Sequence, residues 1–319
     1  MYFIELFLDI EIKNAVCDRF NLLENLESSD QHYNLKKEIN IQRCLGYDYV
    51  RCSLDDFNMP LEKLIAEDTS GIRREEGRAF IDEQNGPIVT WEDFEKYPWP
   101  DPDKCPTTSL EWYEKNLPED MCIIGSGGFA HIAEHLSWLM GYETLCYALF
   151  ENRDLVKAIS DRLIEIYKKM LSRILEFERV KIIWGADDMG FKTGPLISPD
   201  DLREFVLSGH KSLAEMSHKA GRPYLLHSCG KLDLIMEDLI EDVITAVNKY
   251  GDRVAHLGGI DMDFICRSDE KHIRERVRNT LESCFEGGGY CLGTGNSVAN
   301  YIPLDNYLTM LDEGRKFIY

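Results

Sequence analysis

The alternation of short apolar runs with amphipathic helical patterns is the feature that most constrains the fold of this chain. The apolar runs have the length of buried strands and lie at Tyr49–Leu54, Met121–Gly125, Lys181–Gly185, Pro223–His227, Arg253–Leu257 and Tyr290–Thr294. Helical patterns lie between them, and the clearest cover residues 152–178, 199–220 and 304–317. This alternation predicts an α/β fold in which helices cover parallel strands.

Two closures of such a sheet are open, a doubly wound sheet and a (β/α)8 TIM barrel. No Gly-x-Gly-x-x-Gly pattern follows an early strand, which weakens the dinucleotide-binding form of the doubly wound sheet. Polar side chains follow one strand after another, among them Asp187, Asp188, Asp261 and Asn296. In a barrel the carboxyl ends of all strands meet on one face, where active sites lie. The sequence therefore favours the barrel.

We expect residues 1–319 to form a single barrel domain. Residues 1–120 would supply the N-terminal helices, the first strand and an irregular excursion, and residues 121–319 would supply the main strand–helix repeats. The stretch 91–106 is rich in proline and acidic residues, which indicates a surface excursion and not a linker.

Composition limits the partners. The chain carries 57 acidic and 36 basic side chains and a formal charge of −21, which argues against binding to nucleic acid or to anionic membranes. Its ten cysteines are scattered without a Cys-x-x-Cys pair, as is typical of reduced thiols. The N-terminus lacks the basic start of a signal peptide, and no apolar run reaches the roughly 18 residues of a membrane span. We expect a cytoplasmic protein.

The sharpest local motif is His227-Ser-Cys229-Gly, at the end of a predicted strand. Side chains two residues apart on a strand point to the same side, so this pair can share a metal ion. Imidazole and thiolate together suit zinc. A buried histidine beside a small buried cysteine fits the motif equally well, so the pair alone does not establish a metal site.

Asp187 and Asp188 follow the apolar run KIIWGA. Adjacent carboxylates repel each other and are costly to remove from water, so they need a solvated opening, a metal or a hydrogen-bond donor. We expect at least one of them in the site, although one could cap a turn while the other is solvated. Trp184 in the preceding strand is a candidate substrate-binding residue, as are the strand-end residues Asp261 and Asn296.

Other histidines carry weaker signals. The segment HIAEH (131–135) matches the spacing of inverted zinc proteases, but no downstream ligand motif supports that function, and two ordinary helix histidines are the favoured interpretation. His210, His218 and His272 lie in amphipathic helical patterns and are expected at the surface.

Four segments of the chain, in order, resemble the uroporphyrinogen decarboxylase (URO-D) superfamily. They are WGADDMGFKTGPLISPDDLREFV, GRPYLLHSCGKL, YGDRVAHLGGIDMDF, and GGGYCLGTGNSV with IPLDNYLTML. The resemblance covers about residues 120–319. The resemblance implies a URO-D-like TIM barrel. True decarboxylases carry an N-terminal RQAGRY-type segment whose arginines bind the substrate carboxylates. Nothing similar occurs in residues 1–60 here, and a charge of −21 suits a polyanionic substrate poorly.

The second branch of the superfamily, the corrinoid-dependent methyltransferases and O-demethylases, is the closer one. Its members bind zinc through a His-x-Cys pair and a later cysteine. The resemblance therefore implies that His227 and Cys229 are zinc ligands. Asn296 stands at the position of the later cysteine, so the third ligand would be Cys291 or Asp188. Asp187, Asp188 and His227 would be the catalytic groups.

The implied function is a zinc-assisted methyl transfer between a small methylated substrate, of the methoxyaromatic or methylamine type, and a corrinoid, as in the O-demethylations of anaerobic metabolism. The chain has no corrinoid-binding motif of the Asp-x-His-x-x-Gly type, so a separate partner protein would carry the corrinoid. A URO-D-like lyase and a barrel that binds a small molecule without catalysis stay open as alternatives, and so does a homodimer.

The resemblance also predicts a gap. In relatives a strand and a loop separate the helix after HSCG from the YGDR turn, whereas here IMEDLIEDV runs directly into ITAVNKYGDR. We expect that a segment is missing near residues 241–245. A barrel without that strand would have an open seam with exposed strand edges.

Overall fold

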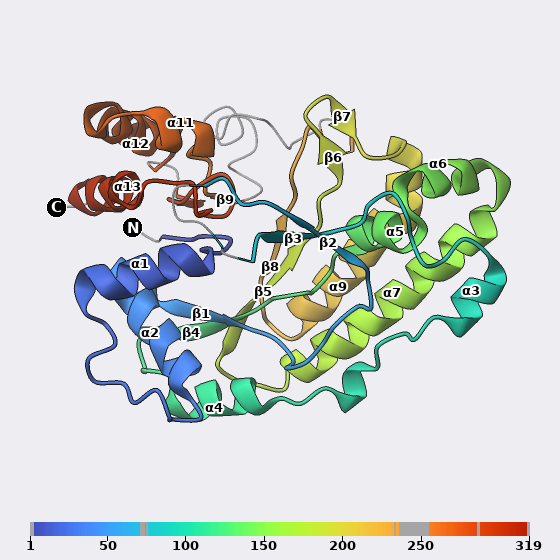
Figure 1. Cartoon of the computed structure of the whole chain (residues 1–319), viewed down its shortest axis with the longest axis horizontal. Helices are drawn as coiled ribbons and strands as arrows, with labels where there is room; N and C mark the ends of the chain where they lie inside the picture. The colour runs from blue at the N-terminus through green and yellow to red at the C-terminus, as the bar shows by residue number, and fades with distance from the viewer. Residues whose placement is uncertain are drawn as a thin grey trace. The chain divides into compact units, whose positions relative to one another are not determined.

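The computed structural model describes residues 3–70, 74, 76–232, 234–235, 255–285 and 288–317. The chain forms two compact units (Figure 1). Unit 1 consists of Met1–Asp48, Glu67–Arg78 and Met236–Tyr319, and unit 2 consists of Tyr49–Ala66 and Ala79–Ile235. The gap that the sequence predicts near 241–245 lies outside the described residues, and the single-domain interpretation stays a prediction.

Unit 2 is built on a sheet of four strands in the order β1-β4-β5-β8. The strands are β1 (Tyr49–Cys52), β4 (Cys122–Gly125), β5 (Val180–Ala186) and β8 (Tyr224–His227). All neighbours are parallel, with Val50 beside Ile123 and Trp184 beside Leu225. Each strand coincides with an apolar run that predicts it. Because parallel strands end at the same edge of a sheet, the residues that follow β5 and β8 lie close together.

Helices connect these strands. They are α4 (Thr108–Asn116), α5 (Ile132–Met140), α6 (Tyr142–Glu151), α7 (Arg153–Ile174) and a continuous helical stretch of α8 (Pro199–Leu202), the π-helical η2 (Arg203–Leu207) and α9 (Ser208–Lys219). The apolar stripe of α7 is buried along its whole length, and α7 and α9 lie side by side (Figure 1). The stretch from α8 to α9 coincides with the helical pattern predicted over 199–220, and Ser198 caps its start, since its hydroxyl accepts a hydrogen bond from the Asp201 N–H at 3.1 Å.

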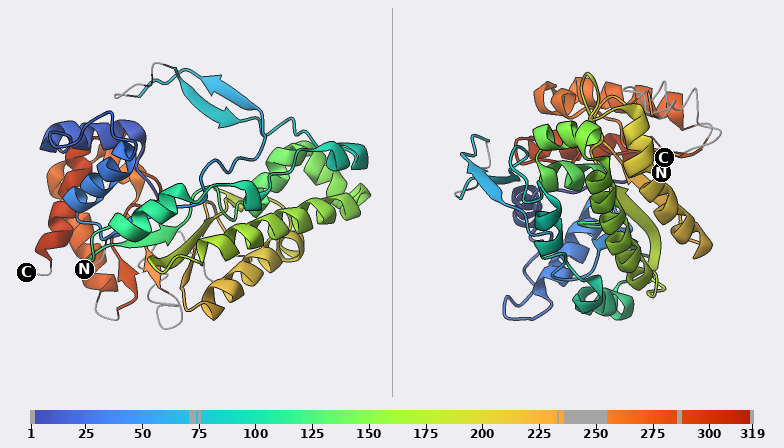
Figure 2. Two further views of the ribbon diagram at one scale, coloured as in Figure 1. Left: turned by 90° about the horizontal axis from the view of Figure 1, so that it is seen from below. Right: turned by 90° about the vertical axis from the view of Figure 1, so that its right-hand side faces the viewer.

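The N-terminal excursion contains more regular structure than the sequence predicts. Strands β2 (Lys63–Ala66) and β3 (Arg78–Ile81) form a two-stranded sheet (Figure 2), and the short helices α3 (Trp91–Lys96) and η1 (Pro102–Lys104) follow. Helix α3 begins with a capping box in which Thr90 and Asp93 satisfy each other's backbone N–H. That box is a local signal, but the surrounding prolines and acidic residues mask it.

Unit 1 combines five described helices with short parallel strands. The helices are α1 (Ile10–Phe20), α2 (Tyr33–Leu45), α11 (Met262–Arg267), α12 (Glu270–Cys284) and α13 (Leu304–Lys316), and the strands are β9 (His256–Leu257) and β10 (Tyr290–Cys291). Isolated parallel bridges join Phe3 to Leu292 and Leu8 to Val298. The N-terminal residues thus pair in parallel with the segment 292–298 and join the strand layer of β9 and β10, which the sequence does not predict.

A buried carboxyl group lies in this strand layer. The side chain of Glu5 is buried and accepts hydrogen bonds from the backbone N–H of Thr294 at 3.2 Å and from its hydroxyl. Burial raises the pKa of Glu5 from its ordinary value of 4.5 to about 8, although the bonds from Thr294 and Tyr47 oppose the change. The folded protein therefore holds a proton on Glu5 at pH 7, whereas the unfolded chain has released it.

This difference predicts how stability depends on pH. Between pH 4.5 and 8 the folded state binds one more proton at Glu5 than the unfolded state, so the free energy of unfolding falls as the pH rises through this window, by roughly 3–5 kcal/mol. Glu5→Gln mimics the protonated acid and should remove this fall, as measured by urea unfolding from pH 4.5 to 9. The control is Glu11→Gln, because the hydrogen bond from Arg74 lowers the pKa of Glu11. An unchanged pH profile in Glu5→Gln would contradict the prediction.

Candidate metal centre

Strands β5 and β8 are parallel neighbours (Figure 1), and three potential metal ligands lie at their carboxyl ends. A carboxylate oxygen of Asp188, an imidazole nitrogen of His227 and Sγ of Cys229 all lie within 4.8 Å of one another. Cys229 Sγ is 3.4 Å from His227 Nε2, and His227 Nε2 is 3.7 Å from Asp188 Oδ1. A tetrahedral zinc ion with bonds of about 2.0–2.3 Å has ligand atoms roughly 3.3–3.8 Å apart. The separation of His227 from Cys229 therefore matches a zinc site, and that of His227 from Asp188 is slightly longer than the roughly 3.3–3.4 Å of one nitrogen and one oxygen ligand.

Backbone hydrogen bonds hold the three ligands in place. The N–H of Asp187 donates to the carbonyl of His227 at 2.9 Å, which joins the ends of the two strands. The N–H of Cys229 donates to Asp188 Oδ1, also at 2.9 Å. The loop after β5 and the loop after β8 are thus tied to each other by the ligand residues themselves. Such ties fix the ligands before a metal binds.

The turn after Cys229 requires glycine. Gly230 has a φ of +91°, and a Cβ atom there would lie 2.3 Å from the backbone carbonyl group of Gly190. Gly190 belongs to a small antiparallel pair, β6 (Gly190–Phe191) with β7 (Gly194–Pro195). The HSCG turn therefore packs directly on the backbone of β6.

We expect Gly230→Ala to weaken zinc binding by about 10–100-fold, as is typical when a residue that supports a metal ligand is replaced. The added methyl group must push the turn away from Gly190 and so move Cys229. Gly221→Ala is the matched control, because Gly221 also has a positive φ, +71°, but no atom lies within 4 Å of its would-be Cβ. Competition with a zinc chelator measures both affinities. Equal affinities in the two variants would contradict this expectation.

Electrostatics favour the metal-binding form of His227. Burial lowers the pKa of the imidazole, and the positive charges of Arg51 and His131 lower it further, whereas Asp188 acts in the opposite direction. The net effect keeps His227 neutral near pH 7. A neutral imidazole is the form that binds a metal.

Trp184 lies buried in β5 beneath a cation. The Arg51 guanidinium lies over the indole ring, 5.1 Å from its centroid, and Arg51 Nε donates to Ser126 Oγ at 2.6 Å. Arg51 comes from β1, and its positive charge lowers the pKa of His227. Nothing in the sequence singles out this arginine. The substrate-binding role of Trp184 stays a prediction, and Arg51, which lies over its ring, is a second candidate.

The two adjacent aspartates have different surroundings, as their mutual repulsion requires. The Asp187 side chain is 0% exposed, whereas that of Asp188 is 45% exposed. Asp187 accepts hydrogen bonds from the N–H groups of Ala133 at 2.9 Å and Glu134 at 3.1 Å, and it pairs with His210 Nε2 at 2.8 Å. Its carboxylate thus stabilises the N-terminus of α5.

The expectation that His210 lies at the surface is wrong. Its side chain is buried, its Nε2 contacts Asp187, and its Nδ1 lies 3.0 Å from the Tyr224 hydroxyl. A signal was present in the sequence, because His210 shares the helical stripe of the buried residues Phe205, Val206 and Leu213. A histidine on the apolar stripe of a helix finds a buried polar partner.

The HIAEH segment lies at the start of α5. His135 is buried with its Nδ1 against the Tyr167 hydroxyl, and burial lowers its pKa to about 3. His131 Nδ1 is hydrogen-bonded to the Glu134 carboxylate. The two histidines thus have separate partners. Among the described residues, the group of Asp188, His227 and Cys229 is the only one with three potential ligands.

The remaining candidates lie in unit 1. Asp261 caps α11 by accepting a hydrogen bond from the Phe264 N–H at 2.7 Å. Asn296 is exposed, and its Oδ1 accepts from the Ser297 N–H at 2.7 Å. Their substrate-binding roles stay predictions. Cys291 lies in β10, and burial raises the pKa of its thiol. Of the two candidates for the third ligand, Asp188 is the one whose carboxylate lies within 4.8 Å of His227 and Cys229. Its role as a ligand stays a prediction.

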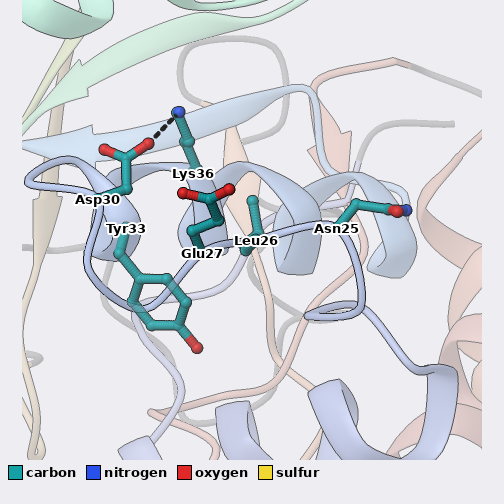
Figure 3. Close-up of a pocket in the computed structure, with 6 residues that line it drawn as sticks. All are labelled: Asn25, Leu26, Glu27, Asp30, Tyr33 and Lys36. Atoms are coloured by element: carbon teal, nitrogen blue, oxygen red, sulfur yellow. Dashed lines mark hydrogen bonds and ion pairs between the residues drawn. The ribbon is translucent and has the colours of Figure 1, made fainter.

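A separate hollow of about 240 Å³ lies between α1 and α2 and is lined by Asn25, Leu26, Glu27, Asp30, Tyr33 and Lys36 (Figure 3). Lys36 Nζ pairs with Asp30 Oδ2 at 2.5 Å. The cation of this hollow is therefore neutralised by its own wall, and the lining offers no reactive group.

Parallel strands that carry polar groups at their carboxyl ends are typical of α/β enzymes in which chemistry occurs at that edge. The sequence pattern of the uroporphyrinogen decarboxylase (URO-D) family matches residues 72–317, so the chain belongs to this family. Its fold is the TIM barrel of that family, as the sequence predicts.

A solved structure, a methyltransferase from Methanosarcina mazei, is similar with a TM-score of 0.68. The two sequences are 16% identical, and the similarity covers 100% of this chain and 94% of the other. Likeness at this identity shows a shared fold. No curated protein matches the sequence significantly. In the described part of the chain, no helix is long and apolar enough to cross a membrane.

Proposed function

We propose that this protein is a zinc-dependent methyltransferase that moves a methyl group between a small methylated substrate, of the methoxyaromatic or methylamine type, and a corrinoid carried by a separate protein. The observation that carries the proposal is the group of Asp188, His227 and Cys229 at the carboxyl ends of β5 and β8. The separation of His227 from Cys229 fits tetrahedral zinc, and the ligand types are those of zinc enzymes. The solved structure of the same fold is a methyltransferase, which supports methyl transfer as the kind of reaction.

The three side chains would hold zinc through one nitrogen, one sulfur and one oxygen atom. Three protein ligands leave the fourth position of a tetrahedral site for substrate, as in catalytic zinc sites. Zinc would supply Lewis acidity toward the heteroatom that bears the methyl group. The corrinoid would supply the methyl-accepting centre, and the barrel would position and polarise the substrate.

The residues around the ligands have distinct tasks. Asp187 anchors the loop that carries Asp188 to the N-terminus of α5. The exposed side of Asp188 leaves the ligand group open to a substrate from solvent. The acidic surface favours a neutral or cationic methylated compound over a polyanion. We place the enzyme in the cytoplasm.

A URO-D-like lyase is the second candidate, because the family carries that activity in its name. A decarboxylase acting on a tetrapyrrole with many carboxylates needs cations that bind them. The charge of −21 and the lack of an arginine-rich N-terminal segment disfavour it. The thiolate of Cys229 has no evident task in such a reaction.

Cobalt substitution and two activity assays separate these functions. The protein loaded with Co²⁺ should show the absorption of a tetrahedral site with a thiolate ligand, and Cys229→Ser should lose the thiolate band. Methyl transfer to reduced cobalamin from a panel of methoxyaromatics and methylamines should be detectable, and uroporphyrinogen should not be consumed. Consumption of uroporphyrinogen without methyl transfer would favour the lyase, and inactivity with every compound would favour a barrel that binds without catalysis.

A further inference from the structure

The first turn of α5 holds a histidine–carboxylate pair that the metal-binding group does not use. His131 precedes the helix, and its Nδ1 is hydrogen-bonded to Glu134 Oε2. The imidazole also stacks on Trp138, with centroids 6.4 Å apart and planes inclined by 27°. The side chains of His131 and Glu134 are 22% and 16% exposed, so the pair is largely but not fully buried. Within the part of the chain that the structure describes, Nε2 of His131 has no hydrogen-bond partner.

Asp187 ties this pair to the strand that carries a metal ligand. Its buried carboxylate accepts hydrogen bonds from the N–H groups of Ala133 and Glu134, and Asp188 is the next residue in the chain. This connection is rigid, because the Asp187 carboxylate is also hydrogen-bonded to His210. The start of α5 therefore lies against the end of β5, where the ligand group begins.

Electrostatic effects point to the same proximity. The charge of His131 lowers the pKa of His227, and the carboxylates of Asp187 and Asp188 act to raise the pKa of His131. Together with the hydrogen bonds from Ala133 and Glu134 to Asp187, these effects place His131 near the ligand group, although it does not belong to it.

The groups that surround the pair favour retention of a proton. Burial acts to lower the pKa of His131, but the hydrogen bond and charge of Glu134, together with Asp187 and Asp188, outweigh burial and raise it. Burial also raises the pKa of Glu134. On the same helix His135 is neutral, with a pKa of about 3, and from α7 the Tyr167 hydroxyl donates to the His131 carbonyl at 3.4 Å.

We propose that His131, oriented by Glu134, is a catalytic acid that donates the Nε2 proton to the substrate heteroatom as this atom loses its methyl group. The inference rests on the proposed methyl transfer. The bond between the heteroatom and the methyl carbon breaks, and its electron pair stays on the heteroatom. The reduced corrinoid supplies the electron pair of the new bond to the methyl carbon. The proton of His131 then neutralises the heteroatom, and the imidazole recovers a proton from water.

This role predicts a dependence on the leaving group. His131→Gln should lower kcat/KM by about 10²–10⁴-fold for methyl ethers of weakly acidic phenols, the usual contribution of a general acid. The loss should shrink as the released phenol becomes more acidic. It should be absent for tetramethylammonium, because trimethylamine leaves without needing a proton. The control is His272→Gln, since His272 forms a similar but exposed pair with Asp269 at 2.6 Å.

Two further measurements keep this inference separate from the proposed function. Zinc affinity should be unchanged in His131→Gln, because His131 is not a ligand. The pKa of His131, measured by NMR in the zinc-loaded protein without substrate, should fall in Glu134→Gln. Three results would overturn the acid role of His131 while methyl transfer stands. They are an equal loss of kcat/KM for all leaving groups in His131→Gln, methyl transfer from quaternary amines alone, and a pKa of His131 that does not change in Glu134→Gln. A wild-type protein that transfers no methyl group from any compound would instead overturn the proposed function.

Discussion

His227→Ala is expected to purify without stoichiometric zinc and to transfer methyl groups at least about 10³-fold more slowly than the wild type. In the proposed site His227 supplies the nitrogen ligand, and its Nε2 lies 3.7 Å from Asp188 Oδ1 and 3.4 Å from Cys229 Sγ. Lewis-acid polarisation of a substrate is worth several kcal/mol, and each 1.36 kcal/mol corresponds to tenfold in rate. Metal analysis and a single-turnover assay with reduced cobalamin measure the two losses.

The comparison needs a histidine whose removal changes neither folding nor the ligand group. His218 lies exposed near the end of α9 in the same unit, so His218→Ala is that control. Circular dichroism would show that both variants are folded. Full zinc content and full activity in His227→Ala would remove the basis of the proposed metal site.

The two adjacent aspartates should have opposite effects. Asp187→Ala leaves the N–H groups of Ala133 and Glu134 and the imidazole of His210 without their buried acceptor. Each unsatisfied buried donor costs roughly 1–3 kcal/mol, so the free energy of unfolding should fall by about 3–5 kcal/mol. Asp188→Ala removes a half-exposed ligand. It should change stability by less than about 1 kcal/mol while weakening zinc binding.

Urea unfolding of the zinc-free protein and chelator competition measure these effects separately. A double-mutant cycle of Asp187→Ala with His210→Ala should show a coupling of about 0.5–3 kcal/mol, as expected for residues in direct contact. A loss of stability in Asp188→Ala as large as that in Asp187→Ala would contradict the division of tasks between the two carboxylates.

Local patterns predict the scaffold well. The apolar runs at 181–185 and 223–227 have the length and composition of buried strands, and they form neighbouring strands β5 and β8. Because parallel strands end at one edge, the position of the HSCG motif and of the two aspartates follows from the fold class. The meeting of Asp188 with His227 and Cys229 is therefore predictable in outline. The separations between their ligand atoms come from the structure alone.

The features that the sequence does not predict depend on contacts between residues far apart in the chain. The N-terminal bridges of Phe3 and Leu8 join segments almost the whole chain apart, and six residues offer too few positions for a periodic pattern. Arg51 acquires significance only because β1 places it over Trp184. His131 lies in a segment that matches a protease motif, and only the contacts of α5 with Asp187 reveal its relation to the ligand group.

The most direct test of the central claim is the rate of methyl transfer to reduced cobalamin before zinc removal, after removal with a chelator, and after zinc is restored. The panel should contain methoxyaromatics and methylamines, and the appearance of methylcobalamin should be followed by absorbance. The account predicts turnover of at least one compound, its loss with the metal and its return with zinc. A rate that is indifferent to zinc, or no transfer from any compound by the zinc-loaded protein, would contradict it.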